Sequence, residues 1–451
     1  MKIKNAEAFR SRLILILAIT YYLSYFIFGI YGEKYLHADG SYTFYNLLGT
    51  KDFTIYPLGR AHYDYMFEFP MVFGMKLGIR HIPTLGFLLG LGESMWVPIF
   101  FLSAILVYLY HKNYLFAELT FVLSFFSLTF VGFSQTIESP AALGCLCLVL
   151  AFSFSHTARS PKWETVLMLS MIPLCYHLNE MFMFWGLLVA LIILYRTFFA
   201  KKEMRLTRLW SLYAIAWIGI AWLSGGSVSA RSGGGMPSIA DIFREMLACD
   251  PKVPIINLLI IMGLLMLSLS VFQWHLIGMI KTVMTAILLV LDLYYIFTRA
   301  GRLAGSCFNL RFCNLAAGVV FSLILLTLFA VAQKITMQNL SVLLVALCII
   351  GCSYNIVTAA EFHHLNDDLC SYAQASNHIG YIEDNSTSIF EKNHIGYRWD
   401  WSLAHQCVAA QVLRGHTDIH CIVIGSDYVY DPTDKNNYCV YSQYGITLSL
   451  P

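Results

Sequence analysis

An acidic residue, Asp39, stands in a short polar segment, His37-Ala38-Asp39-Gly40-Ser41-Tyr42, directly after a strongly apolar run over residues 13–31. At 1.5 Å per residue, a run of that length is about long enough to cross the hydrocarbon core of a bilayer. The residues before the run are basic at Lys2, Lys4, Arg10 and Arg12. Because positive charge beside a first span usually stays in the cytoplasm, Asp39 is expected on the far side of a membrane. A carboxylate there can act as a general base, and the alternative is an Asx turn or a helix cap.

Two further carboxylates, Glu138 and Glu180, are expected in turns on the same side, so three separate loops could bring acidic groups to one site. Acidic residues at or inside a bilayer are costly and are therefore functional candidates. The alternatives for both glutamates are snorkelling to the interface or a hydrogen bond to a neighbouring helix. Glu93 and Asp292 fall within apolar runs and are interpreted as structural pairs or cavity liners.

Candidate substrate-binding groups surround these acids in the sequence. His62 and Asp64 beside Arg60 could orient a phosphate or the base, or be solvated at the interface. Cations near the headgroup plane can hold a phosphate through charge-assisted contacts or can simply anchor lipid headgroups. The arginines expected to do this are Arg60, Arg80, Arg231 and either Arg299 or Arg302.

Histidine and tryptophan supply the remaining candidates. His177 precedes Glu180 by three residues, a spacing that resembles a metal-ligand pair but occurs often by chance, so no metal is predicted. The pairs His363-His364 and Asp367-Asp368 are interpreted as a polar linker. Trp399 and Trp401 could stack on sugar faces, although burial in a small core or against the membrane is the commoner use of such residues.

Composition restricts the class of protein. Of 451 residues, 58% are hydrophobic and only 12% are charged, which indicates a polytopic membrane protein. The net charge is only +2, and binding of nucleic acid needs a clustered basic face, so nucleic acid is not expected as a partner. The first apolar run lacks a small-residue cleavage site after a short core and is read as a retained helix.

The pattern predicts an all-α membrane protein with about eleven transmembrane helices, an interfacial helix within residues 60–82 and a small α/β external domain over 358–451. The expected spans are residues 13–31, 83–110, 114–133, 139–156, 165–177, 181–197, 209–224, 254–272, 275–297, 312–332 and 338–357. Residues 165–197 could instead form one helix kinked at Pro173. Arg299, Arg302 and Arg311 would lie outside, against the usual charge bias. Either the number of spans between 254 and 311 is wrong, or an anionic lipid headgroup holds these arginines outside.

Two loops and the tail complete this topology. The first external loop covers 32–82, and a Gly-rich external loop over 225–253 is expected to be mobile, with a short helix over 238–249. In the tail, Leu403–Leu413 is predicted as a helix and Cys421–Gly425 as a buried strand. Four tail cysteines, Cys370, Cys407, Cys421 and Cys439, allow three pairings in an oxidising compartment, and otherwise remain thiols.

This arrangement resembles the GT-C superfamily of integral-membrane glycosyltransferases. The features that carry the resemblance are Asp39 just after the first span, the amphipathic first loop, the acidic turns at Glu138 and Glu180, and a C-terminal external domain. Many members carry an Asp-Asp or Asp-Glu pair in the first loop, where this chain has Asp39-Gly40. The resemblance implies that Asp39 takes a proton from an acceptor hydroxyl while arginines hold the leaving phosphate, with inversion at the sugar and without a cofactor.

The implied donor is a polyprenyl-phosphate-linked sugar, and the implied acceptor is a glycan, lipid or protein at the outer face of the inner (plasma) membrane, in surface polysaccharide or glycolipid modification. Two alternatives remain. One is a lipid-linked oligosaccharide polymerase or ligase. The other is a transporter or flippase in which Glu93 and Asp292 line a path, although paired inverted halves are not evident in the sequence.

Overall fold

The fold is taken from a computed structural model of the chain. It describes residues 2–37, 39–54, 61–132, 138–157, 160–200, 205–231, 307–331, 340–375, 385–395, 400–420 and 440–449. These residues are mostly helical, and the strands among them are β1 (Asp418–His420) and β2 (Thr447–Ser449), which pair in parallel. The expected spans at 254–272 and 275–297 and the strand at 421–425 lie outside the described residues.

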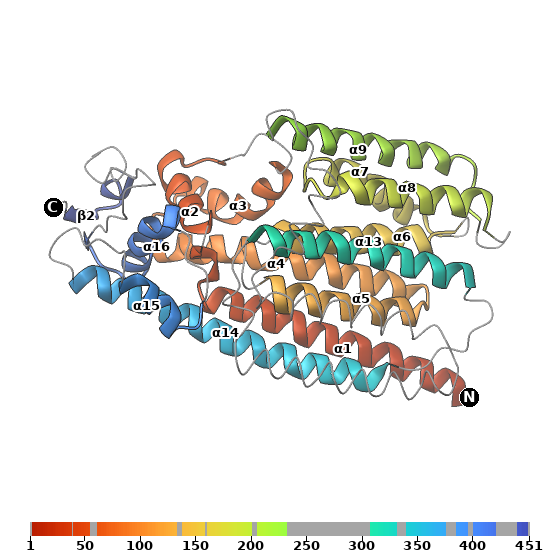
Figure 1. Cartoon of the computed structure of the whole chain (residues 1–451), viewed down its shortest axis with the longest axis horizontal. Coiled ribbons are helices and arrows are strands. Elements are labelled where there is room, and N and C mark those ends of the chain that lie inside the picture. The colour runs from red at the N-terminus through yellow and green to blue at the C-terminus, as the bar shows by residue number, and fades with distance from the viewer. Residues whose placement is uncertain are drawn as a thin grey trace.

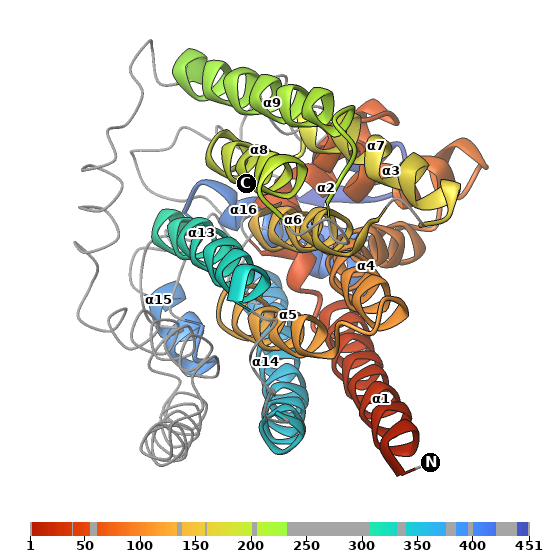
Figure 2. The ribbon, with the colours of Figure 1, turned by 90° about the vertical axis from the view of Figure 1, so that its right-hand side faces the viewer.

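Long helices form a bundle, seen from the side in Figure 1 and along its length in Figure 2. Within the described residues, five helices are long and apolar enough to cross a membrane. They are contained in α1 (Lys2–Tyr31), α4 (Ile82–Tyr110), α6 (Glu138–Ser155), α9 (Trp210–Arg231) and α14 (Ser341–Ala375). The whole span of α6 is buried, where it packs against α4, α7, α8 and α13.

Further helices complete the bundle. They are α5 (Tyr114–Phe126), the π-helical turn η2 (Ser127–Gly132), α7 (Lys162–Tyr176), α8 (Phe182–Phe198) and α13 (Cys307–Val331). Pro173 lies inside α7, and a turn over 177–181 separates α7 from α8, so two helices form here and not one kinked helix. Helix α9 continues through Gly225 and Gly226 to Arg231, which makes the first part of the expected Gly-rich loop helical. The remainder of that loop is outside the described residues.

The bundle has two distinct ends (Figure 1). We call one the first-loop end, where α1 stops and the 3-10 turn η1 (Lys34–Leu36), α2 (Asp39–Thr50) and α3 (Ala61–Lys76) follow. The C-terminal helices α15 (Asn385–Lys392) and α16 (Asp400–Leu413) lie at this same end, and α16 packs on α2 and α14. The other is the N-terminal end.

The tail is joined to the membrane part by a continuous helix. The apolar run of α14 ends near residue 357, but the helix continues to Ala375. Polar residues such as Asn366 stay buried there because α1 and α16 cover them. The predicted helix over 403–413 is confirmed within α16. Tyr444 donates a hydrogen bond to the Leu48 carbonyl (3.2 Å), which ties the end of the chain back to α2.

Helix α3 has its polar side inward. Asp64 and Glu68 are buried, whereas Tyr65, Phe69 and Phe73, spaced four residues apart, are exposed. An exposed aromatic stripe with carboxylates facing protein suits the membrane interface. Inside α3, Pro70 cannot donate to the Met66 carbonyl, and the Trp96 indole N–H of α4 donates to that carbonyl instead (2.8 Å).

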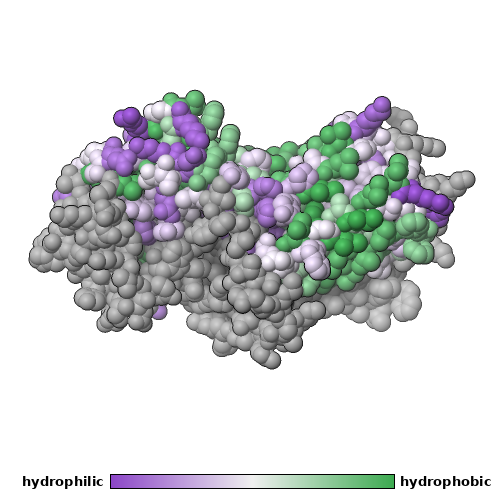
Figure 3. All heavy atoms as spheres, turned by 90° about the horizontal axis from the view of Figure 1, so that it is seen from above, coloured by the Kyte–Doolittle hydropathy of each residue, from purple (hydrophilic) through white to green (hydrophobic). Residues whose placement is uncertain are grey.

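The surface agrees with a bilayer around the bundle. Among the residues that Figure 3 colours, hydrophobic ones form a broad area over the helices, and the most hydrophilic ones lie mainly towards the two ends. At the N-terminal end, Arg10 makes a two-bond ion pair with Glu118 (2.7 and 2.6 Å). Nearby helix ends are joined where the buried Glu164 contacts His111 Nε2 (2.8 Å) and His156 Nδ1 (3.4 Å).

Candidate functional site

Asp39 is the first residue of α2, directly beyond the end of the first span. A carboxylate at a helix start also favours the helix electrostatically, so the capping interpretation and the catalytic one remain compatible. The next residue has a steric reason to be glycine. A Cβ on Gly40 would lie 1.8 Å from the Tyr35 carbonyl oxygen. Any residue with a side chain at position 40 would therefore require a backbone shift.

Gly40→Ala should lower the free energy of unfolding by about 1–3 kcal/mol, because the backbone of η1 must move to admit a methyl group. The measurement is thermal or denaturant unfolding of the purified protein in detergent. Gly219→Ala in α9 is the matched control, since a Cβ there meets nothing within 4 Å. Equal stability of the two variants would contradict the close approach at Gly40.

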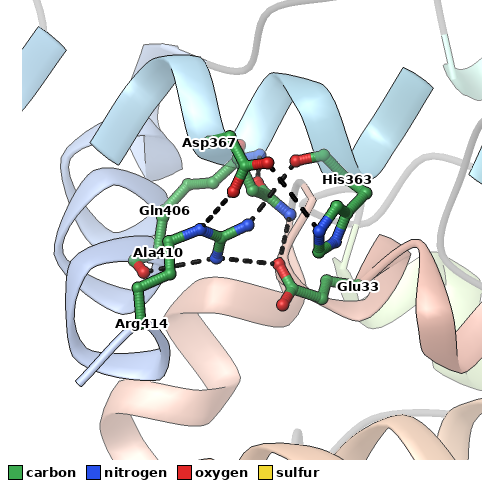
Figure 4. A network of polar contacts seen from close by, with 7 residues as sticks. Glu33, His363, Asp367, Gln406, Ala410 and Arg414 are labelled. Atoms are coloured by element: carbon green, nitrogen blue, oxygen red, sulfur yellow. Dashed lines mark hydrogen bonds and ion pairs between the residues drawn. The ribbon is translucent and has the colours of Figure 1, made fainter. Parts of the chain in front are cut away.

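A chain of polar contacts joins the first-loop end to the tail (Figure 4). Arg414, just after α16, donates to Glu33 Oε2 (3.0 Å) and to Asp367 Oδ1 (2.6 Å). Asn366 also donates to Glu33 Oε2 (3.2 Å), and Gln406 donates to Asn366 Oδ1 (3.0 Å). Glu33 has a left-handed φ of 52°, a strained conformation for a residue with a side chain, and these contacts hold it in place.

The same chain reaches the segment that carries Asp39. Gln406 makes a side-chain hydrogen bond with His37, two residues before Asp39, and burial lowers the pKa of the His37 imidazole to about 4 although this hydrogen bond opposes the shift. On the neighbouring side of α2, the His405 ring lies against Tyr42 (5.3 Å between centroids) and Tyr45 (4.8 Å). Burial lowers the pKa of His405 to about 4 as well. Both imidazoles are therefore neutral at pH 7.

Acid should loosen the contact between α2 and α16. Each histidine has a pKa of about 4 when folded and about 6.5 when unfolded, so the unfolded state binds more protons between those values. The stability that the neutral rings contribute is present above pH 6.5 and is lost as the pH falls to 4, on the order of 3 kcal/mol for each. Unfolding measured from pH 7 to 4 should show this loss, and His405→Gln should reduce the slope. A slope unchanged in that variant would contradict the assignment.

A second group of ionisable side chains lies between α3, α4 and α6. Burial raises the pKa of Tyr63, and the nearby charges of Glu93, Glu138 and Asp64 add to the increase. Asp64 and Glu138 are each at most 8% exposed. Two of the predicted site residues, Asp64 from the first loop and Glu138 from the start of α6, therefore each lie near enough to Tyr63 for their charges to raise its pKa.

The cation of this group is Lys34 in η1, which is 5% exposed. Its ammonium donates to the Tyr25 hydroxyl (2.7 Å). Burial lowers the pKa of Lys34 to about 8, and the negative charge of Glu93 opposes the decrease. Glu93 therefore has a cationic neighbour, which favours its interpretation as a structural pair. Lys34 and Tyr25 were not singled out from the sequence, because a lysine at a span end ordinarily reads as an interface anchor.

Glu68 lies one turn after Asp64 on the buried side of α3. The Thr54 backbone N–H and hydroxyl donate to its two carboxylate oxygens (2.7 and 3.0 Å). Burial raises the pKa of Glu68 to about 8, with Asp64 adding to the increase and Thr54 opposing it. The pattern of two acids at positions i and i+4 could have signalled a shared face, but the surrounding aromatic residues obscured it.

His62 and His177 meet where α3 begins and α7 ends. Their rings lie 5.8 Å apart, and His62 Nδ1 donates to the Leu174 carbonyl (3.2 Å). Burial, with a smaller effect of His62, lowers the pKa of His177. Glu180 sits in the following turn, where Asn179 Oδ1 accepts the Met181 N–H (3.0 Å). In the described part of the chain, no group of three or more metal-ligating residues occurs.

The remaining predicted residues are only partly placed. Arg60 and Trp399 lie outside the described residues, and Asp39, Arg231 and Trp401 are described by their backbone alone. Cys370 and Cys407 are free and buried, and Cys421 and Cys439 are outside the described part. Arg80 is exposed beyond α3. His363 is no linker residue, since it lies in α14 and stacks on Tyr31 (5.0 Å).

Searches of protein-family models, curated proteins and solved structures find no match to this chain.

Proposed function

We propose that the protein is a membrane glycosyltransferase of GT-C type, which moves a sugar from a polyprenyl-phosphate donor to a glycan, lipid or protein acceptor. The observation that carries the proposal is the position of Asp39. It is the first residue of α2, which follows the first span and η1 and on which the tail helix α16 packs. Asp64 and Glu138 lie at the same end of the bundle, so acidic groups gather where a lipid headgroup would arrive.

In the proposed reaction, Asp39 accepts the proton of the acceptor hydroxyl as that oxygen attacks the anomeric carbon, and the lipid phosphate leaves from the opposite face. Glu138 and Glu180 are alternative bases, and His62 and His177, at the same end of the bundle, are hydrogen-bond donors. His177 suits hydrogen bonding to an uncharged group, because its lowered pKa keeps the ring neutral at pH 7.

The proposal extends to topology. We place the N-terminus in the cytoplasm and the first-loop end on the outer side of an inner membrane, with about eleven spans in all and a small α/β domain in the tail. Two sets of contacts at the first-loop end support an ordered site there. One is the hydrogen-bond network of Arg414, and the other is the packing of histidine rings against α2.

The test is transfer of labelled sugar by purified protein from a panel of polyprenyl-phosphate sugars. The proposal is supported if sugar is transferred from one of the donors and if the anomeric carbon of that sugar has the inverted configuration in the product. A polymerase or ligase would instead require a lipid-linked oligosaccharide, which belongs in the same panel. Absence of transfer from every donor, in protein that remains folded, would count against all three enzyme activities and favour a transporter.

A further inference from the structure

An apolar groove of about 670 Å³ opens on the side of the bundle near its N-terminal end. Its walls come from α1, α4, α6 and α7, and their lining residues include Ser11, Leu15, Leu106, Tyr110, Trp163 and Leu167. The volume is that of a small-molecule site, roughly 300–1,000 Å³. Leu106 is 44% exposed and Trp163 is 50% exposed, so the groove faces outward, where hydrocarbon would surround the bundle.

One end of the groove lies at the expected level of lipid headgroups. There α4 ends and α7 begins, and the rings of Tyr110 and Trp163 are in contact, with centroids 6.1 Å apart. Tyr and Trp concentrate at this level in membrane proteins because one side of each ring is apolar and the other is polar.

Exposed cations flank that end. Arg12 follows Ser11 of the groove, Lys162 precedes Trp163, and Lys112 comes two residues after Tyr110. One exposed carboxylate, Glu7, opposes them on α1. Of the other nearby acids, Glu118 is paired with Arg10, and Glu164 is buried with its carboxylate held by His111 and His156, so the three exposed cations outnumber Glu7 and Glu164. Positive charge is therefore in excess beside the aromatic end of the groove.

We propose that the groove and these three cations bind an anionic phospholipid of the leaflet at the N-terminal end. An acyl chain fills the groove, and the phosphate lies among Arg12, Lys112 and Lys162. Basic pockets between transmembrane helices bind anionic headgroups in this way, and cation-to-phosphate hydrogen bonds are strong in such surroundings. This site is at the opposite end from Asp39 and does not depend on the proposed glycosyltransferase activity.

Trp163 supplies the probe. The full chain is reconstituted in phosphatidylcholine vesicles containing a small fraction of phosphatidylglycerol with brominated acyl chains, which quench nearby tryptophan fluorescence. Trp163→Phe, measured in parallel, identifies the contribution of Trp163. We expect severalfold stronger quenching of this contribution by brominated phosphatidylglycerol than by brominated phosphatidylcholine at the same fraction.

Variants distinguish the contribution of the three cations to lipid binding from that of the apolar groove. Replacing Arg12, Lys112 and Lys162 together by Gln should abolish the preference for phosphatidylglycerol, whereas Lys51→Gln, an exposed cation at the other end of the bundle, should retain it. Ser103→Phe narrows the groove without changing charge and should weaken quenching by either lipid. Equal quenching by the two lipids in the wild-type protein, or an unchanged preference in the triple variant, would overturn the proposal.

Discussion

Asp39→Asn should reduce sugar transfer by about 10²–10⁴-fold, the usual contribution of a general base, while leaving expression and folding intact. The amide is close to the carboxylate in shape but cannot accept the acceptor's proton. The measurement is the rate of transfer from the donor that the panel identifies, with purified wild-type protein and variant side by side. The size of the loss in transfer rate shows whether Asp39 is a general base or only caps the start of α2.

Asp52→Asn is the matched control, because Asp52 is an exposed acid of the same loop whose ion pair with Lys76 (2.9 Å) is also exposed. It should transfer at the wild-type rate. Unchanged transfer by Asp39→Asn would move the base to Glu138 or Glu180. A transporter would respond differently, with Glu93→Gln impairing movement of substrate more than Asp39→Asn does.

Lys34→Met should lower the free energy of unfolding by about 3–5 kcal/mol, the usual result of removing one partner from a buried pair. The variant leaves Glu93, which is 8% exposed, without its nearby cation, and it removes the hydrogen bond to Tyr25. Adding Glu93→Gln should recover most of the loss, because the charge that needed compensation is gone. Unfolding in mixed micelles at pH 7 measures both.

Lys76→Met is the control for this variant, since the Lys76 and Asp52 side chains are 55% and 62% exposed. Exposed pairs of this kind contribute about 0–1 kcal/mol. If Lys34→Met is no more damaging than Lys76→Met, Lys34 does not compensate Glu93.

Apolar length predicted part of the helical arrangement. The predicted run over 83–110 corresponds to α4 (Ile82–Tyr110), one of the five helices in the described residues that are long and apolar enough to cross a membrane. Helices α7 and α8 are found where spans were predicted at 165–177 and 181–197, but neither is among those five. The thickness of the bilayer's hydrocarbon core sets the minimum length of a membrane-spanning helix whatever its neighbours are. The length of an apolar run can therefore be read from one sequence. The continuation of α14 to Ala375 was not predictable in the same way, because its polar second half is buried only by α1 and α16.

The candidate site was predictable only in part. Asp64 and Glu138 do lie near a common neighbour, Tyr63, but that proximity depends on how α3 packs against α4 and how α4 packs against α6. The sequence of 60–82 indicated an interfacial helix, and a helix is found there. The sequence did not show which face of this helix would be buried. In a soluble helix the apolar face is buried and the acidic face is exposed, whereas here the aromatic residues are exposed and the acids are buried.

Helix α14 has 35 residues and is therefore about 52 Å long, whereas the hydrocarbon core is about 30 Å thick. Its far part holds Asp367, through which Arg414 and α16 are attached. A rigid rod that is embedded over only part of its length acts as a lever. Because membrane helices tilt to match the local bilayer, a change in bilayer thickness is expected to tilt α14 and to move α16, which packs on both α14 and α2. Lipid chain length is therefore expected to affect the first-loop end without binding to a site there.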